Sequence, residues 1–431
     1  MNRVEIIKDI AKRLSDEEFV ERISNEGHNF LEIAGEHSPP LSPTSLSHGY
    51  PGLVLLYSEL NKLFPEEQWG MVCNDYIGKI LELVTESGIK SFSLFSGVAG
   101  IAFSIACASD NGKRYGRLLE QFNKVLIQQF PKALKEIRSK DVEMFGYDVI
   151  EGVTGVGIYL LAVERSDEMD KLLGDILEYL VSMTSIVEYD SRQVPNWHVK
   201  NEHLFSEAEK QIYPDGIFNL GLSHGIVGPL ILLSAAGNAG IEVSDQREAV
   251  KAVADDLIRL RIKETNEWNC MLGVEEYFAG TQDTQNTRDA WCYGTPGVSI
   301  GLLNAAEYLN DTEYKQIACD AMLEGIGREK GVFSPTFCHG YSCLALIYHK
   351  FYLKAENENF REYRDYLVDR IYEYYDAKNP FGFQNIEFNS GQTKKINSIA
   401  LLDGTTGILL SLLDIINESK VSYWSQAFML Y

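Results

Sequence analysis

Apolar runs that follow a glycine-containing turn recur seven times along the chain. The first reads SHGYPGLVLLY from Ser47, and the last reads LDGTTGILLSLL from Leu402. Six of the turns contain Gly-x-x-Gly, and the sixth has Cys343 in the second glycine position, which keeps that position small. The first glycines of the turns are Gly49, Gly97, Gly152, Gly225, Gly294, Gly340 and Gly404. A helix that is apolar on all sides must be buried on nearly all sides, so the runs predict seven buried helices.

Segments with helical periodicity and many charges separate the apolar runs. They lie near residues 3–25, 70–87, 115–138, 168–184, 245–262, 312–328 and 359–376. Each has one apolar and one polar face, which is typical of a helix that faces water. Seven such helices alternating with seven buried ones predict an all-α fold, a closed α/α toroid with an inner and an outer ring. We expect residues 1–431 to form a single domain of this kind.

Two longer segments interrupt the alternation. Residues 185–218 contain β-branched, aromatic and proline residues and lose helical periodicity after Ser185. This pattern indicates a small strand-containing insertion between the third and fourth repeats. Residues 266–288 are polar and lead directly into the fifth turn. We interpret them as a loop, and loops of this length are often functional.

The residue before the first glycine is not aliphatic in any of the seven turns. In a toroid all the turns lie at one end, so these residues would face one shared cavity. They are His48, Ser96, Glu151, His224, Tyr293, His339 and Asp403. Helix capping explains Ser96 and Asp403. It does not explain why three of the eight histidines lie directly before the first glycine of a turn. We therefore expect the functional site at the end of the toroid where the glycine turns lie.

Two cysteines occupy equivalent positions in neighbouring repeats. Cys292 and Cys338 each lie two residues before the first glycine, and His339 follows Cys338 directly. Two thiolates and one neutral imidazole with a fourth position open are the ligand pattern of a catalytic zinc site. Adjacent residues can share an ion only from an irregular turn, which Pro335 favours here. The spacing alone is weak evidence, and buried core thiols remain the alternative.

The other cysteines have no such arrangement. Cys343 is a conceivable fourth ligand, but its place at the start of the sixth apolar run favours a core role. The remaining four are interpreted as packing or surface thiols: Cys73, Cys107, Cys270 and Cys319. Seven irregularly spaced cysteines in a long chain do not indicate a disulfide framework, which favours a reducing cytoplasm.

The charge balance is strongly acidic. The 431 residues include 39 Lys and Arg against 62 Asp and Glu, which gives a formal net charge of −23. This charge opposes nucleic acid and anionic membrane surfaces, so we expect no nucleic-acid partner. Neither a signal peptide nor a membrane span is apparent, and the expected location is cytoplasmic.

The glycine turns, with WCYG at 291–294 and CHG at 338–340, resemble the lanthionine synthetase C-like family over about residues 47–413. The resemblance implies an α/α toroid with one zinc ion per chain. In bacterial members it implies a class I lanthipeptide cyclase, which acts on a precursor peptide of leader and core. A separate enzyme has already dehydrated Ser and Thr residues of this peptide. Its cysteine thiols then add to dehydroalanine and dehydrobutyrine, which forms lanthionine and methyllanthionine rings.

The same resemblance implies roles for four further residues. His224 in LSHGIVG matches the acid or base, and Asp148 in YDVIEG matches its acidic partner. Arg288 in TRDAWCYG is suited to stabilise the enolate oxygen, and Tyr293 lies beside a proposed zinc ligand. The ordinary alternatives are a structural Asp148–Arg288 ion pair and a packing role for Tyr293. His48 lies in the same register, but the resemblance assigns it no role.

Three other functions stay open at this point. A member of the same family can add glutathione or another thiol to dehydrated peptides. An α/α-toroid glycosidase needs two carboxylates, for which Asp148 and Glu151 are candidates. The third alternative is a non-catalytic scaffold that binds a peptide or a partner enzyme. For the cyclase, the resemblance implies a separate dehydratase and a peptide exporter as partners, at the inner face of the membrane.

Overall fold

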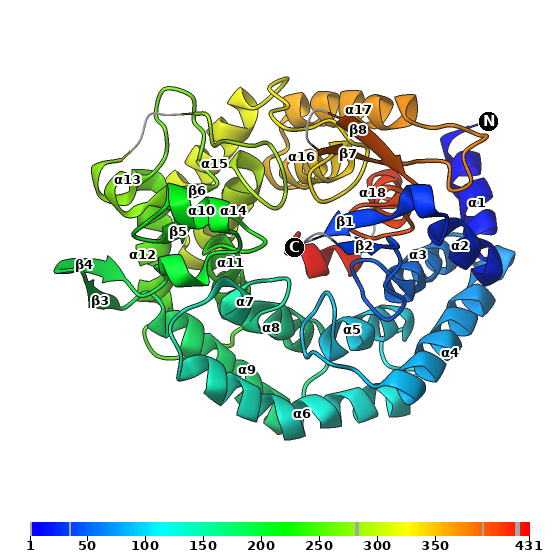
Figure 1. Cartoon of the computed structure of the whole chain (residues 1–431), viewed down its shortest axis with the longest axis horizontal. Helices are drawn as coiled ribbons and strands as arrows, with labels where there is room; N and C mark the ends of the chain where they lie inside the picture. The colour runs from blue at the N-terminus through cyan, green and yellow to red at the C-terminus, as the bar shows by residue number, and fades with distance from the viewer. Residues whose placement is uncertain (1, 34–35, 281–283, 390–391, 419–422) are drawn as a thin grey trace. The chain divides into compact units, whose positions relative to one another are not determined.

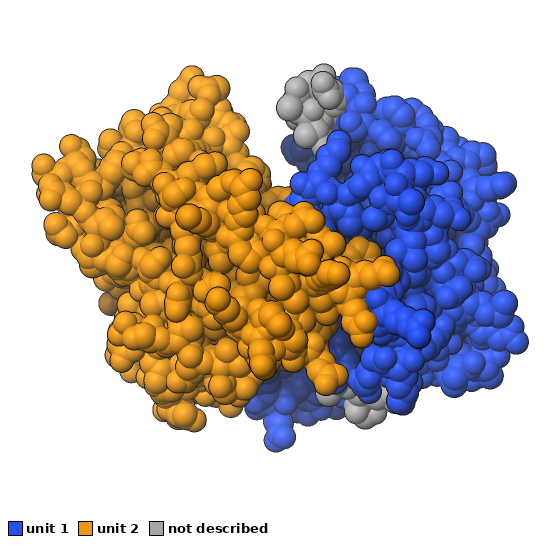
Figure 2. Space-filling model, turned by 90° about the horizontal axis from the view of Figure 1, so that it is seen from below, with its two compact units in different colours: residues 1–91, 95–119, 332–424 blue, residues 92–94, 120–331, 425–431 orange. Residues whose placement is uncertain are grey.

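The computed structural model describes residues 2–33, 36–280, 284–389, 392–418 and 423–431. It divides into two compact units, which Figure 2 colours separately. The first unit consists of residues 1–91, 95–119 and 332–424, and the second of residues 92–94, 120–331 and 425–431. The single domain expected from the sequence therefore stays a prediction.

Each glycine turn is followed by a buried helix. The first unit contains α3 (Tyr50–Leu63), α5 (Val98–Ala108), α16 (Tyr341–Ala355) and α18 (Thr405–Ile416), and the second contains α8 (Val153–Ala162), α11 (Val227–Asn238) and α14 (Thr295–Leu309) (Figure 1). In the first unit α18 packs against α3 and α16, and α3 packs against α5. In the second unit α11 packs against α8 and α14. The predicted buried helices are confirmed at all seven places.

The amphipathic segments form helices that cover the buried ones. They are α1 (Arg3–Leu14), α2 (Glu17–Ser24), α4 (Trp69–Ser87), α6 (Gly116–Arg138), α9 (Asp167–Ser182), α12 (Gln246–Arg259), α15 (Thr312–Glu324) and α17 (Glu358–Glu373). α4, α9, α15 and α17 each pack against the buried helix that precedes them, and α12 packs against α11 and α14. Within the described parts of the chain, every helix is too short or too polar to cross a membrane.

The first amphipathic segment forms two helices where the sequence predicts one. α1 ends at Leu14, and the Asp16 carboxylate accepts the Phe19 N–H group 3.0 Å away to begin α2. Aspartate is a preferred residue at such a helix start. Both helices bury apolar side chains, such as Ile10 and Val20. The apolar periodicity continues through residues 3–25, so it does not reveal the break between α1 and α2.

The strands form short antiparallel pairs. They are β1 (Leu31–Ile33) with β2 (Glu36–Ser38), β3 (Ile186–Tyr189) with β4 (Arg192–Pro195), β5 (Ile217–Asn219) with β6 (Met271–Gly273), and β7 (Asn385–Asn389) with β8 (Gln392–Ile396). Short helices complete the described elements: α7 (Met144–Tyr147), α10 (Glu207–Ile212), α13 (Val274–Ala279) and the 3-10 helices η1 (Gly27–Asn29), η2 (Pro65–Glu67), η3 (Asn201–His203) and η4 (Trp424–Phe428).

The 185–218 insertion contains strands, as predicted. β3 and β4 form a hairpin whose turn residues Asp190 and Ser191 have φ values of 46° and 61°. A two-residue hairpin turn of this kind requires positive φ at both positions. The insertion also contains the helix α10, which begins with a capping box between Ser206 and Glu209. A six-residue helix is too short to show periodicity in the sequence.

The segment 266–288, interpreted as a loop, is partly regular structure. It contains β6 and α13, and residues 281–283 lie outside the described residues. β6 pairs with β5 at the end of the insertion, with Ile217 opposite Gly273. Pairing between segments so distant in the sequence leaves no local signal.

Backbone hydrogen bonds join the glycine turns of the first unit. The Ser47 N–H group donates to the Phe95 carbonyl at 3.0 Å, and the Ser47 carbonyl accepts from Leu401 at 2.8 Å. The N–H group of Cys338 in turn donates to the Leu402 carbonyl at 2.9 Å. These bonds bring the turns before α3, α5, α16 and α18 side by side.

Equivalent bonds join the turns of the second unit. The Val149 N–H group donates to the Ser223 carbonyl at 3.0 Å, and the Leu222 N–H group donates to the Cys292 carbonyl at 2.9 Å. The turns before α8, α11 and α14 are therefore neighbours. The residues that precede their glycines emerge at the same end of the buried helices.

Candidate active site

His224 and Asp148 meet on neighbouring turns of the second unit. The Nδ1 atom of His224 lies 2.5 Å from the Oδ2 atom of Asp148. The other oxygen of Asp148 accepts the N–H groups of Glu151 at 2.8 Å and Gly152 at 2.6 Å, at the start of α8. Asp148 is fully buried, whereas the imidazole is partly exposed. The carboxylate thus holds the ring in one orientation and favours Nδ1 as the protonated nitrogen.

A buried amide connects this turn with Tyr293. The side-chain nitrogen of Asn219, at the end of β5, lies 3.3 Å from the Tyr293 hydroxyl, and its oxygen accepts the Gly221 N–H group at 2.9 Å. The Tyr293 ring packs closely on Gly221, where a Cβ atom would lie 2.6 Å from the ring. Burial raises the pKa of Tyr293, so its hydroxyl is protonated at neutral pH.

No local feature of the sequence marks Asn219 as a site residue. It lies at the end of the insertion, in a β-strand whose partner β6 is remote in the sequence. The side chain is fully buried, and a buried amide requires partners for both its nitrogen and its oxygen. Only the fold supplies these partners.

The turn that carries Cys292 is held on both sides. The Cys292 carbonyl accepts the N–H groups of Leu222 at 2.9 Å and Ser223 at 3.3 Å. The indole N–H group of the preceding residue, Trp291, donates to the Phe428 carbonyl at 2.8 Å. Gly294 follows with φ of 86°, and a Cβ atom there would lie 1.8 Å from the Arg288 carbonyl oxygen. Only glycine fits this backbone conformation.

Arg288 lies at the start of the same turn. Its carbonyl accepts the Thr295 N–H group at 3.2 Å, and its side chain passes over Gly331, where a Cβ atom would lie 3.1 Å from Nε. Asp148 pairs with His224 and not with Arg288, so the alternative of a structural Asp148–Arg288 pair is wrong.

The ion pairs beside Arg288 involve other residues. Asp289 accepts from Arg328 at 2.7 Å, and Lys330 lies 2.6 Å from the buried Glu267. Burial alone would raise the pKa of Glu267, but hydrogen bonds from Lys330 and Thr287 and the charge of Arg328 lower it overall. These buried pairs anchor both ends of the segment that leads to the Cys292 turn.

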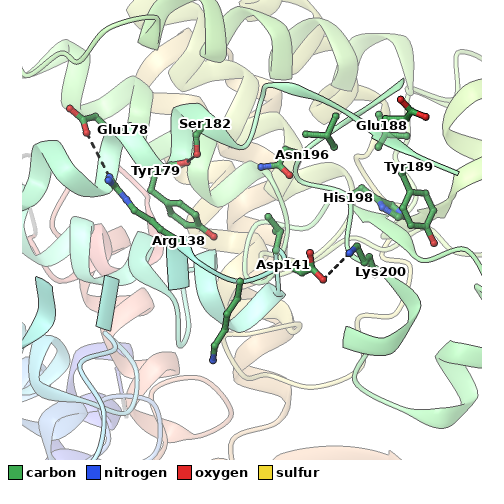
Figure 3. A pocket seen from close by; sticks show the side chains of 14 residues that line it. Arg138, Asp141, Glu178, Tyr179, Ser182, Glu188, Tyr189, Asn196, His198 and Lys200 are labelled. Atoms are coloured by element: carbon green, nitrogen blue, oxygen red, sulfur yellow. Dashed lines mark hydrogen bonds and ion pairs between the residues drawn. The ribbon is translucent and has the colours of Figure 1, made fainter. Parts of the chain in front are cut away.

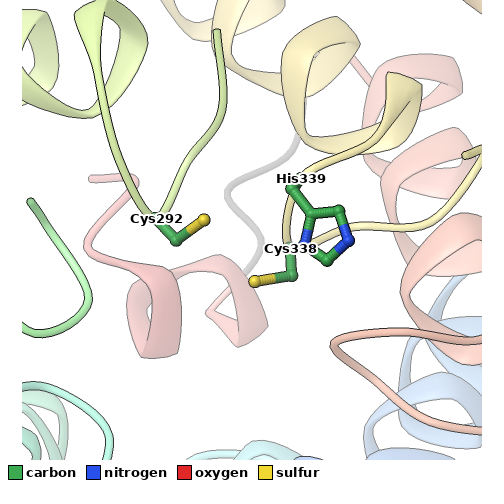
Figure 4. Close-up of side chains that lie close together, drawn as sticks. All are labelled: Cys292, Cys338 and His339. Carbon is green, nitrogen blue, oxygen red and sulfur yellow. The ribbon is translucent and has the colours of Figure 1, made fainter. Parts of the chain in front are cut away.

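The turn before α16 presents Cys338 and His339 at consecutive positions, whereas Cys292 comes from the turn before α14 (Figure 4). Gly340 follows them, and a Cβ atom there would lie 2.3 Å from the Ser334 carbonyl oxygen. The backbone at this turn is therefore closely packed. Cys338 and His339 belong to the first unit, and Cys292 belongs to the second.

Asp403 lies between two histidines of the first unit. Its Oδ1 atom is 3.9 Å from Nδ1 of His339, and its Oδ2 atom is 3.8 Å from Nε2 of His48. The Nδ1 atom of His48 is 2.8 Å from the Ser47 hydroxyl. Burial lowers the pKa of His48, and Asp403 partly counters this effect. His48 thus contacts the carboxylate that lies beside His339.

None of the seven cysteines, all of which lie in the described residues, forms a disulfide. The thiol of Cys343 donates to the Gly340 carbonyl at 3.2 Å inside the helix start, which matches a core role. Burial raises the pKa values of Cys73, Cys107 and Cys270 to about 12. These three thiols are therefore uncharged at neutral pH and poor nucleophiles.

A polar cavity of about 550 Å³ lies between α6, α9 and the β3–β4 hairpin. Lys200 reaches Asp141 on one side of it, at 2.7 Å, and Arg138 faces Glu178 on the other (Figure 3). None of the predicted catalytic or metal-binding residues lines this cavity. It is separate from the turns that carry the proposed chemistry.

Comparisons with known proteins agree with the sequence resemblance. Residues 40–429 match the family model described as lanthionine synthetase C-like protein. The whole chain is 26% identical to the nisin biosynthesis protein NisC of Lactococcus lactis subsp. lactis and covers 97% of that protein. A solved structure of nisin cyclase matches with a TM-score of 0.80 and 25% identity, over 98% of this chain and 97% of that one, which confirms the predicted toroid fold class. The chain belongs to the lanthionine synthetase C-like family.

Proposed function

We propose that this protein is a lanthipeptide cyclase, which closes thioether rings in a dehydrated precursor peptide. The observation that carries the proposal is family membership over residues 40–429. The Asp148–His224 pair supports it, because the reaction needs a group that exchanges protons. NisC is named for nisin biosynthesis, and nisin cyclase has the same fold, so peptide cyclisation is the activity that these likenesses support.

The reaction adds a thiol across a carbon–carbon double bond. The sulfur bonds to the β-carbon of dehydroalanine or dehydrobutyrine, and the double-bond electrons move onto the carbonyl group as an enolate. A proton then returns to the α-carbon. The peptide gains and loses no atoms, so the enzyme must supply a base for the thiol and an acid for the α-carbon.

His224 is suited to exchange both protons. Asp148 contacts its Nδ1 atom, so Nε2 is the atom that we assign to proton transfer with the substrate. A ring that has accepted the thiol proton is stabilised by the buried carboxylate beside it. The same proton is then available for the α-carbon.

Tyr293 and Arg288 are the donors that we assign to the enolate oxygen. The raised pKa of Tyr293, caused mainly by burial, keeps its hydroxyl protonated and able to donate. Arg288 carries a permanent charge and five N–H donors. Donors of this kind stabilise an oxyanion most strongly when their backbone is held in place, as in the segment 288–294.

Cys292, Cys338 and His339 are the residues that we assign to one zinc ion. The donor set fits this metal, because zinc prefers thiolate and imidazole ligands. The carboxylate of Asp403 beside His339 is the kind of group that orients a ligating imidazole. When bound, zinc would convert the incoming peptide thiol to a thiolate.

The proposed chemistry also requires partners. Unmodified Ser and Thr side chains are not electrophiles, so a separate dehydratase must act on the peptide first. We propose this dehydratase and a peptide exporter as partners, with the protein working in the cytoplasm at the inner face of the membrane. Co-purification with each partner would test this arrangement.

The direct test uses a dehydrated peptide with a free cysteine, incubated with and without glutathione. Cyclisation does not change the peptide mass, so ring formation is measured as loss of the cysteine that a maleimide reagent can label. Loss of labelling without glutathione supports the cyclase. A product that always carries the mass of glutathione would instead identify a protein that adds external thiols.

The geometry argues against the glycosidase alternative. Both oxygens of Asp148 are already engaged, one by His224 and the other by two backbone N–H groups. A glycosidase needs a carboxyl group that can give its proton to a sugar oxygen. The scaffold alternative predicts that replacement of His224 leaves peptide processing unchanged, which the same assay checks.

A further inference from the structure

Two exposed phenylalanines lie against His224. Phe145 is 52% exposed and Phe205 is 42% exposed, and their ring centroids are 4.7 Å apart. Both rings meet the imidazole edge to face, with centroid distances of 6.0 Å for Phe145 and 5.5 Å for Phe205. Isolated exposed apolar side chains are common on protein surfaces. Two that meet at the proposed proton-transfer group form an apolar surface where the peptide must bind.

The two rings come from distant segments. Phe145 belongs to α7, three residues before Asp148, whereas Phe205 belongs to the 185–218 insertion. The Tyr147 hydroxyl donates to the His224 carbonyl at 3.1 Å, which ties α7 to the His224 turn. The insertion therefore contributes a side chain to the proposed catalytic site.

An ion pair and a histidine–carboxylate contact hold the insertion against the segment that leads into α7. Lys200 lies 2.7 Å from Asp141, and Nδ1 of His203 lies 3.3 Å from Glu143. These contacts join residues 200–203, which precede Phe205, to residues 141–143, which precede Phe145. These contacts position the two rings as a pair.

We propose that Phe145 and Phe205 form an aromatic wall that binds the side chain next to the dehydrated residue and selects apolar neighbours. The inference rests on the proposed cyclase function. Aromatic faces gain free energy by burying apolar side chains, and they lose it when they desolvate a charge. Asp141, Glu143 and Glu202 lie on the same two segments, and Glu202 is 3.6 Å from His203. Asp141 is paired with Lys200, so the negative charges of Glu143 and Glu202 remain to disfavour an acidic neighbour.

The test compares two dehydrated peptides that differ only beside the dehydroalanine, with Leu in one and Asp in the other. We expect the unmodified protein to cyclise the Leu peptide with a kcat/KM at least about tenfold higher, the ratio that the burial of one apolar side chain typically produces. Phe145→Ala and Phe205→Ala should lower this ratio toward one, mainly by raising KM for the Leu peptide. Phe205→Leu, which stays apolar, should restore much of the preference.

A matched control is Phe278→Ala. Phe278 is 46% exposed in α13 and contacts Tyr277 rather than His224. Its replacement should leave the ratio unchanged, and melting temperatures of all variants should remain close to that of the unmodified protein. Ring formation with equal kcat/KM for both peptides, or an unchanged ratio in the two alanine variants, would overturn the aromatic wall. If the unmodified protein forms rings in neither peptide, the cyclase function is overturned, and the aromatic wall with it.

Discussion

Asp148 contacts His224 and the start of α8 at the same time. Its Oδ2 atom lies 2.5 Å from the imidazole, and its Oδ1 atom accepts two backbone N–H groups. The carboxylate therefore cannot rotate away from the ring without losing its hydrogen bonds to the N–H groups of Glu151 and Gly152, in the turn before α8. This coupling places the imidazole on a rigid part of the fold rather than on a flexible loop.

His224→Ala should lower the rate of ring formation by about 10²- to 10⁴-fold, the usual contribution of a positioned acid or base. Asp148→Asn should also lower it, because the amide does not stabilise a charged imidazole. The amide oxygen can still accept the N–H groups of Glu151 and Gly152, so the melting temperature should change little. Single-turnover labelling of the remaining free cysteine measures the rate. His28→Ala, at an exposed histidine, is the control, and full activity of His224→Ala would contradict the assigned role.

Metal content separates the ligands from the other site residues. Cys292→Ala, Cys338→Ala and His339→Ala should each lose zinc in elemental analysis, because three protein ligands are the minimum of the proposed site. His224→Ala and Cys319→Ala should retain it. A chelator should abolish ring formation by the unmodified protein, and added zinc should restore it. Stoichiometric zinc in both Cys292→Ala and Cys338→Ala would contradict the ligand assignment.

Asn219 and Tyr293 should act as one unit. Tyr293→Phe removes one oxyanion donor and should lower kcat by about 10²- to 10³-fold. Asn219→Ala removes only the amide beside the tyrosine hydroxyl and should lower kcat by less, because the donor stays but is no longer oriented. The double variant should be no slower than Tyr293→Phe alone, because both changes remove the same interaction. Multiplicative effects would show that Asn219 acts independently of the hydroxyl.

The stability of the second unit should depend on the ionisation of Glu267. Its pKa in the folded protein is lowered overall, so the carboxylate contributes stability above the unfolded value of about 4.3, and this contribution is lost as pH falls through the lower folded value. Glu267→Gln should therefore lower the free energy of unfolding at pH 7, because it removes the charged partner of Lys330 and Arg328. The difference should shrink toward zero at acid pH. Denaturant unfolding measures this difference. If Glu267→Gln lowers the free energy of unfolding by the same amount at every pH, the loss comes from packing instead.

Gly294→Ala should disrupt the turn that carries Cys292. The residue has φ of 86°, and the added Cβ atom would lie 1.8 Å from the Arg288 carbonyl oxygen. We expect a marked fall in melting temperature. Gly78→Ala is the contrasting variant, because Gly78 lies inside α4 and a Cβ atom there meets nothing within 4 Å. That change should stabilise the helix by about 0.5–1 kcal/mol.

The sequence by itself determined the repeated turns and the helices that follow them. A glycine turn and the apolar run after it are local features, so their positions predict the starts of α3 and α14 without knowledge of any contact. The resemblance identified the family, and the comparisons confirm it. The roles assigned to His224, Arg288 and the zinc ligands stay predictions.

Only the tertiary structure decided which distant side chains meet. The partner of Asp148, the amide of Asn219 beside Tyr293, and the placement of Phe205 against His224 depend on contacts between segments far apart in the sequence. Such contacts follow from the packing of whole elements, among them the pairing of β5 with β6, and no local periodicity encodes them. The sequence therefore predicted the scaffold, whereas the arrangement of side chains around His224 required the fold.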